Sequence, residues 1–152
     1  MSRSDIEYDF PRLIGKEFDL SDESFNYNCL AFALGDHSQW WEPPMAPGQY
    51  WPPGFSDDVS IQTVEKIIRV HGYTKELELD SMPETEAIAI YGIGGEWAHF
   101  AKFSSGKWKA KLGWGHDVQG VSLSDMEVPI YGKVIKILSR PGGTVQQSEI
   151  TP

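Results

Sequence analysis

The sequence predicts an α+β fold in which helices pack on one side of an antiparallel sheet. Helix-forming patterns lie in the first half of the chain, and strand-forming patterns dominate the second half. A tight-turn signal joins two of the strand patterns as a hairpin, so those two strands are expected to be antiparallel. No internal repeat is visible, and 152 residues is close to the commonest length of one domain.

The chain opens with a segment over residues 1–24 that is expected to be an irregular, charged lead-in. The folded domain is expected over residues 25–139. From Asn28 the pattern changes to the apolar run "CLAFAL", which ends at Gly35. This run predicts a short buried helix with a glycine at its C-terminal end, and Asn26 or Asn28 can cap its N-terminus.

Residues 36–58 are expected to form a long ordered loop. They contain five prolines, two glycines and three of the six tryptophans. Helices and central strands do not accommodate so many prolines, and the aromatic side chains argue against disorder. Long loops inside compact domains are usually functional when they are ordered.

A second helix is predicted over residues 60–72, where apolar side chains recur at helical spacing: Ile61, Val64, Ile67 and Ile68. Ser60 offers an N-cap and Gly72 ends the pattern. Strands are then expected over five segments: residues 75–79, 86–93, 96–103, 106–113 and 131–138. Residues 104–106, "SSG", form the hairpin turn, and residues 140–152 are expected to be a flexible tail.

The charge of the chain excludes one class of partner. The formal net charge is −9 and the isoelectric point is near 4.8, so the surface repels nucleic-acid phosphates. A group of lysines interrupts this acidity (Lys102, Lys107, Lys109 and Lys111) and is interpreted as a solvated strand face. The sequence shows neither a signal peptide nor a membrane-spanning run, so we expect a cytoplasmic protein, unless it is exported without a classical signal.

Cys29 is the only cysteine, and it stands where the first helix is expected to begin. A single cysteine forms no internal disulfide, which fits a reducing compartment. Unpaired N–H groups at a helix N-terminus stabilise a thiolate and can also hold an oxyanion. Cys29 is therefore a candidate nucleophile; the alternative is a buried thiol that packs as a small apolar side chain.

A thiol nucleophile needs a base, and the chain has four histidines. His71 lies near the end of the second helix and His37 beyond the end of the first, so both are expected to be structural. His116 falls in a glycine-rich connection. His99 stands at the start of a strand, after two glycines that permit close approach of another segment, and is the candidate base.

Two motifs carry a resemblance to a known superfamily. "NCLAFA" followed by "AHFAKFSSGKWKAKLG" resembles the Cys and His motifs of papain-like cysteine hydrolases, the group that contains the NlpC/P60 and CHAP amidases. The chain is also similar to an uncharacterised bacterial group with an "NCxAxAxG" motif, a "YWPPG" loop and a "GxWxxKLG" strand, here at residues 28–35, 50–54 and 106–113. The resemblance covers most of residues 26–138 and implies a catalytic helix packed on an antiparallel sheet, which would make the domain a catalytic one.

The resemblance implies that Cys29 is the nucleophile and His99 the general base. A third residue usually orients the imidazole from the neighbouring strand. Pairing across the hairpin is expected to place Ala110 or Lys111 opposite His99, and neither side chain can accept a hydrogen bond from the ring. Asp117 is the nearest carboxylate downstream and is our candidate; a backbone carbonyl or a simple dyad are the alternatives.

No cofactor is expected. His99, His116, Asp117 and Cys29 include the residue types that bind zinc, but closely spaced pairs of ligands are absent from the sequence, so no metal is expected.

Four tryptophans are candidates for substrate binding: Trp40, Trp41, Trp51 and Trp97. The first three belong to the proline-rich loop. Trp97 is expected to share a sheet face with His99, because it lies two residues before it on one strand. The alternative is that these rings form a small core that holds the loop on the sheet.

Two functions remain open. The first is a cysteine hydrolase (an amidase, peptidase or deamidase) acting on a peptide, protein or other amide-containing substrate; by analogy it would suit a bacterial effector or toxin. The second is a non-catalytic binding module of the same fold, for example an immunity or accessory protein, with a protein partner docking on the Trp/Pro loop. A purely structural domain has no positive support.

Overall fold

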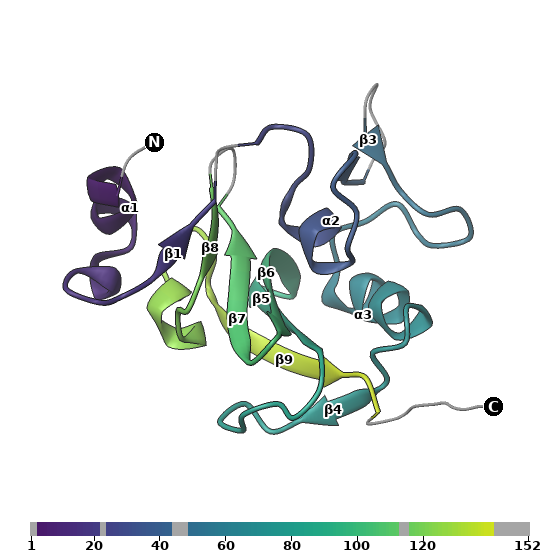
Figure 1. Ribbon diagram of the computed structural model, residues 1–152. Coiled ribbons are helices and arrows are strands. Elements are labelled where there is room, and N and C mark those ends of the chain that lie inside the picture. Colours follow the sequence, from purple (N-terminus) through teal and green to yellow (C-terminus); the bar gives the residue numbers. More distant parts are fainter. Residues whose placement is uncertain (1–2, 22–23, 44–48, 113–115, 142–152) are drawn as a thin grey trace.

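The computed structural model describes residues 3–21, 24–43, 49–112 and 116–141, and it shows an α+β fold (Figure 1). Within these residues the helices are α1 (Arg3–Asp9), α2 (Cys29–Ala33) and α3 (Ile61–Val70), with short 3₁₀ turns η1 (Pro11–Leu13) and η2 (Leu123–Met126). The strands are β1 (Asp19–Leu20), β2 (Trp40–Trp41), β3 (Gln49–Tyr50), β4 (Lys75–Leu77), β5 (Ala87–Ile93), β6 (Glu96–Ser104), β7 (Lys107–Lys111), β8 (Asp117–Gln119) and β9 (Lys133–Ser139).

One antiparallel sheet organises the described part of the chain, in the strand order β1-β8-β7-β6-β5-β9-β4. The hairpin between β6 and β7 forms as predicted, with Ser105 and Gly106 at positive φ in its turn. β2 and β3 form a separate two-stranded parallel ladder inside the predicted loop. The strand β8 was not predicted, because three residues are too few to show an alternating pattern.

Helices cover both faces of the sheet, so the prediction that they lie on one side is wrong. α2 and α3 cover one face, where Ile88, Ile90 and Phe100 meet the apolar sides of both helices. α1, η1 and η2 lie against the other face, where Ala89 and Tyr91 point (Figure 1). These alternate side chains of β5 therefore pack into two different hydrophobic cores, and neither set faces solvent.

The N-terminal segment is part of the second core rather than an irregular lead-in. Ile6, Phe10 and Leu13 are buried against the sheet, and β1 pairs with β8 at its edge. The segment was predicted to be irregular because its apolar residues are few and are separated by charges. The predicted tail lies outside the described residues except for Arg140 and Pro141.

The helices α2 and α3 begin where their caps predict. The side chain of Asn28 accepts a hydrogen bond from the Ala31 N–H, and that of Ser60 accepts one from the Thr63 N–H. Gly35 follows α2 with φ +83°, a conformation that favours glycine.

A β-bulge at Ala98 turns the side chains of its two neighbours, Trp97 and His99, to different faces of the sheet. Tyr91 pairs with His99 while Gly92 pairs with Trp97, so Ala98 is the extra residue. Trp97 consequently packs with the α2 and α3 core, at 5.2 Å between its ring centroid and that of Phe100. His99 shares the opposite face with Tyr91, so the prediction that Trp97 and His99 share one face is wrong.

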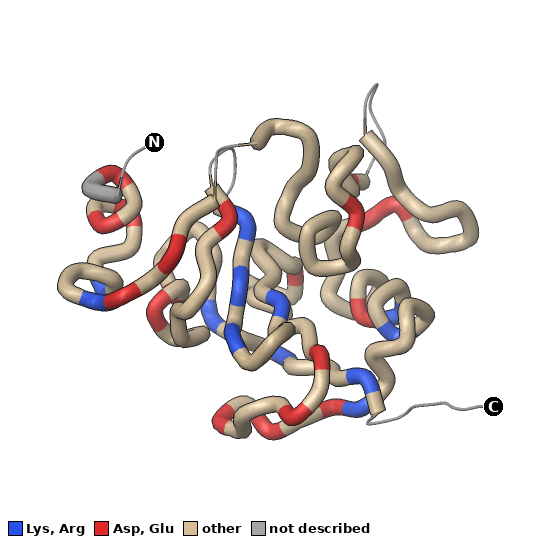
Figure 2. The backbone as a smooth tube through the Cα atoms, viewed as in Figure 1, with Lys and Arg blue, Asp and Glu red and all other residues tan. Residues whose placement is uncertain are grey.

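Basic side chains gather on the central strands, and acidic ones lie mostly around them (Figure 2). Lys111 departs from the expected solvated face because it is fully buried, with its ammonium 5.3 Å from the centre of the Tyr27 ring. Among the described residues, no helix is both long and apolar enough to cross a bilayer.

Candidate active site

Cys29 and His99 line the same small cavity, which has a volume of about 150 Å³. Its wall consists of residues from α2, the β2 segment, β6 and the turn before β9: Asn28, Cys29, Trp40, Glu42, Trp97, Ala98, His99 and Tyr131. Binding sites for drug-sized ligands are about 300–1,000 Å³. This cavity therefore suits one small group, such as the end of a side chain, better than an extended ligand.

Cys29 is the first residue of α2. It lies beside the first part of β6, where that strand has no hydrogen-bonded neighbour on its β7 side. The β6–β7 ladder starts at the pair Ala101 and Ala110, so the β6 backbone before it is open on that side. The expectation that Ala110 or Lys111 lies opposite His99 is therefore wrong. The backbone N–H of Phe100 points to the thiol of Cys29.

The thiol is protonated at neutral pH. Burial raises the pKa of Cys29 to about 11; the backbone N–H groups of Phe100, Leu30 and Cys29 itself lower it only in part, and the charge of Glu42 raises it further. The expectation that the helix N-terminus stabilises a thiolate is thus outweighed by desolvation.

The imidazole of His99 is 1% exposed and is enclosed by two tyrosine rings. It stacks on Tyr131 with 3.7 Å between ring centroids, and Tyr91 meets it edge-on at 5.3 Å. Burial lowers the pKa of His99 to about 3, so the ring is neutral at neutral pH. A neutral imidazole has one nitrogen free to accept a proton, but a pKa this far below neutral makes the ring a weak base in this conformation.

Several buried polar atoms around the cavity lack hydrogen-bond partners in the described part of the chain. They are both ring nitrogens of His99 and the indole nitrogen of Trp97. The thiol of Cys29 therefore does not hydrogen-bond to His99 in this conformation, although the two residues line one cavity. Buried polar groups are nearly always partnered in proteins, so these three atoms mark the surroundings of the cavity as unusual.

Asp117 does not interact with His99. Its Oδ2 accepts a hydrogen bond of 2.8 Å from the Tyr27 hydroxyl, and its backbone N–H donates to the Ser21 hydroxyl. Burial and this carboxylate together raise the pKa of Tyr27 to about 12. The prediction that Asp117 orients the imidazole is not what the geometry shows, because the β7–β8 register puts Asp117 opposite Lys111.

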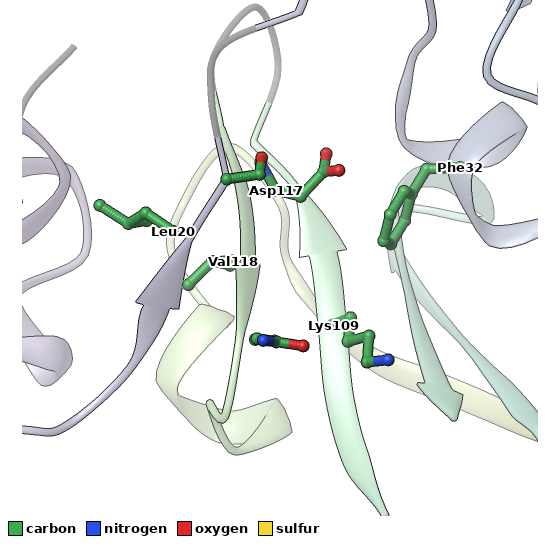
Figure 3. Close-up of a pocket in the computed structure, with 7 residues that line it drawn as sticks. Leu20, Phe32, Lys109, Asp117 and Val118 are labelled. Carbon is green, nitrogen blue, oxygen red and sulfur yellow. The ribbon is translucent and has the colours of Figure 1, made fainter. Parts of the chain in front are cut away.

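Asp117 instead lines a second pocket, of about 220 Å³, on the outer part of the sheet. Figure 3 shows Asp117 and Lys109 on neighbouring strands, with Phe32 of α2 facing them and Leu20 of β1 beyond. Cys29 and His99 do not line this pocket, so it is a separate feature of the surface.

The four tryptophans divide between the cavity and the core. Trp40 and Trp97 line the cavity. Trp41 and Trp51 are buried in the α2 and α3 core, where their indole N–H groups donate to the Asp36 carboxylate and the Ser56 carbonyl, both at 2.8 Å. The structure thus places two of the four candidates at the cavity and gives the other two a structural position.

The remaining histidines lie elsewhere. His37 contacts the Tyr27 ring, His71 hydrogen-bonds to the Ile67 carbonyl at 2.9 Å, and His116 hydrogen-bonds to the Ser21 carbonyl. Within the described residues, no three potential metal ligands of the His, Cys, Asp and Glu types come together.

Four residues of the cavity wall were not predicted as site residues: Asn28, Glu42, Ala98 and Tyr131. Glu42 directly follows Trp40 and Trp41, and a lone carboxylate beside two tryptophans is a signal that could have identified it. Tyr131 had no such signal, because it reaches His99 only through the packing of the turn before β9.

Residues 19–139 match the family model described as a domain of unknown function, DUF7689. No curated protein and no solved structure matches the chain.

Proposed function

Because this chain belongs to the DUF7689 family, whose function is unknown, we propose a function from the site itself: a cysteine hydrolase that cleaves an amide-type bond. The observation that carries the proposal is the cavity shared by the thiol of Cys29 and the imidazole of His99, with unpartnered polar atoms in its wall. A cysteine that opens a helix and a histidine on a later strand also support the relation to papain-like hydrolases. The expected location is the cytoplasm, where the thiol stays reduced.

The proposed reaction starts from a neutral pair rather than a thiolate–imidazolium pair. As the Sγ atom of Cys29 attacks the substrate carbonyl carbon, its proton passes to the free nitrogen of His99. This step requires the two groups to close to hydrogen-bonding distance, and catalytic hydrogen bonds commonly shorten only when substrate is bound.

The second half of the reaction regenerates the enzyme. The C–N bond breaks, and His99 returns the proton to the leaving amine. Water then attacks the thioester while His99 accepts a proton from it, and the acid leaves as Cys29 is reprotonated. In this scheme the stacked tyrosine rings, rather than a carboxylate, hold the imidazole in position.

The test is a hydrolysis assay with a panel of fluorogenic amino-acid and dipeptide amides. Cys29→Ala is expected to abolish turnover, and His99→Gln to reduce kcat by about 10²-fold or more, the usual contribution of a general base. His71→Gln is the matched control, because His71 is exposed and does not line the cavity. Asp117→Asn is expected to retain activity, since Asp117 faces Tyr27.

Turnover that persists in Cys29→Ala, or that falls equally in His99→Gln and His71→Gln, would contradict the proposal. The second candidate is a non-catalytic binding module. It is favoured by one observation, that no hydrogen bond joins the thiol of Cys29 to His99. This candidate predicts that the parent protein turns over no amide in the panel and that Cys29→Ala leaves partner binding through the Trp/Pro loop intact.

A further inference from the structure

We propose that the cavity selects a substrate that carries a positively charged group, an ammonium or a guanidinium, close to the scissile carbonyl. This inference rests on the proposed function and adds its substrate class. It is drawn from the part of the cavity wall that the proposed reaction does not use, namely Glu42 and the aromatic rings beside it.

Glu42 supplies the negative charge of the cavity. Its side chain is half-buried, and its Oε2 accepts a hydrogen bond of 3.0 Å from the Gln49 side-chain amide. Its backbone N–H donates to the Tyr50 carbonyl, which fixes the residue on the β2–β3 ladder. In the described part of the chain no Lys or Arg forms an ion pair with Glu42, so the carboxylate can receive a cation from outside.

Aromatic rings complete the surroundings of a cation. Trp40, Trp97 and Tyr131 line the cavity together with Glu42. Tryptophan is the side chain whose ring face attracts cations most strongly, and recessed sites that combine aromatic rings with a carboxylate are suited to ammonium groups. The volume of about 150 Å³ fits the end of one such side chain.

The thiol lies within the field of this carboxylate. The charge of Glu42 contributes to the raised pKa of Cys29, which places the two groups close enough to influence each other. The same field attracts a cationic substrate and repels an anionic one. The net charge of −9 favours the approach of cations in general, so the specific effect of Glu42 must be separated from this background.

The test measures the rates at which Cys29, the only thiol of the full-length chain, reacts with three methanethiosulfonates. One reagent carries a trimethylammonium group, one a sulfonate, and one a neutral methyl group. Relative to a small free thiol, the cationic reagent is expected to gain at least about 10-fold over the anionic one, as charged clefts typically achieve. Both rates are divided by those of a small free thiol, because a thiolate itself favours a cationic reagent, and Glu42→Gln is expected to lower this corrected ratio by at least about 10-fold.

Two controls isolate the charge of Glu42. Glu78→Gln removes the same charge from an exposed position outside the cavity and is expected to leave the ratio unchanged. The neutral reagent reports changes in thiol pKa or access, which affect all three rates and cancel in the ratio. A parent ratio equal to that of a small free thiol, or a ratio that Glu42→Gln and Glu78→Gln alter equally, would overturn the inference.

This measurement needs no turnover, so its failure is distinct from failure of the proposed function. A cationic preference that depends on Glu42, in a protein that hydrolyses no amide, would support the cation site and contradict the hydrolase. If amides are hydrolysed, N-acetylated arginyl and lysyl amides, which differ from the N-acetylated leucyl amide in side-chain charge, are expected to have kcat/KM at least about 10-fold above it. Glu42→Gln should remove this advantage, and an advantage unchanged in Glu42→Gln would overturn the inference.

Discussion

The imidazole of His99 lies flat against the phenol ring of Tyr131, with 3.7 Å between the ring centroids and 1° between the ring planes. Together with the edge of Tyr91, this stack fixes the orientation of the imidazole and removes it from water. In papain-like cysteine proteases a hydrogen-bonded side chain orients the catalytic imidazole. The two tyrosines therefore explain how His99 is held although Asp117 faces elsewhere.

Replacing Tyr131 is expected to change the pKa of His99. Tyr131→Ala opens the ring to water, and the pKa should rise from about 3 toward the ordinary value of 6.5, because burial is the cause of its depression. Tyr131→Phe keeps the stacked ring and should leave the pKa low. Proton NMR titration of the His99 ring, assigned by comparison with His99→Gln, measures both. An unchanged pKa in Tyr131→Ala would show that this stack does not control the imidazole.

The low pKa of His99 also predicts how stability depends on pH. Below about pH 6.5 the unfolded chain takes up a proton at this residue, whereas the folded chain does so only near pH 3. The free energy of unfolding should therefore fall on acidification through this window, by at most about 1.4 kcal/mol per pH unit from this residue. His99→Gln lacks this group and should show a flatter decline in urea unfolding.

Other lowered pKa values, such as that of Asp125, add to the acid sensitivity of both proteins and cancel in the comparison. Burial alone would raise that pKa, but hydrogen bonds from Lys16 and Ser122 lower it. Parallel stability curves for the parent and His99→Gln would mean that the imidazole titrates normally in the folded state.

The raised pKa of Cys29 predicts slow alkylation of the resting protein. Reaction with iodoacetamide should be slow at neutral pH and should accelerate with pH toward about 11, because burial disfavours the thiolate. His99→Gln should leave this profile unchanged, since the imidazole does not hydrogen-bond to the thiol. The urea-unfolded chain is the control and should follow an ordinary thiol titration. Rapid alkylation near pH 6 that depends on His99 would instead reveal a thiolate–imidazolium pair.

The side chain of Asn28 joins α2 to Trp41 of the Trp/Pro loop. Replacing it should lower the free energy of unfolding by more than replacing an ordinary helix cap. Its Oδ1 accepts from the N–H groups of Ala31 and Trp41, and its Nδ2 donates to the Trp41 carbonyl at 2.8 Å. Asn28→Ala is expected to lower the free energy of unfolding by about 2–4 kcal/mol, because buried groups of Trp41 lose their partners as well.

Ser60→Ala is the matched control, because it removes the cap of α3 at a partly exposed position and should cost about 1 kcal/mol. Urea denaturation of both variants measures the difference. Equal costs would show that the contacts of Asn28 with Trp41 contribute nothing to stability.

Patterns within one segment of the sequence predicted the fold well. α2, α3 and the β6–β7 hairpin were each predicted from spacing, caps and turn residues that act over a few positions. The position of Cys29 at the start of a helix was predicted in the same way. The features that these local patterns did not predict depend on contacts between segments far apart in the sequence.

The bulge at Ala98 is such a case. A period of two predicted that Trp97 and His99 share a face, but one extra residue in β6 sends their side chains to opposite faces. Asp117 was chosen by its distance along the chain, whereas the β7–β8 register brings it to Tyr27. The stack of Tyr131 on His99 joins residues 32 positions apart and leaves no local pattern. Register and packing decide these contacts, and neither can be read from one segment.

The most direct test of the account is the lifetime of an acyl group on Cys29. Reaction with p-nitrophenyl acetate, followed by intact-mass measurement, shows acetylation of the only thiol and then its loss by hydrolysis. A hydrolase in which His99 activates water predicts that the acetyl-thioester decays at least about 10²-fold faster in the parent than in His99→Gln. Equal lifetimes in the two proteins would show that His99 does not act on a thioester at Cys29, and would contradict the assignment of this cavity as an active site.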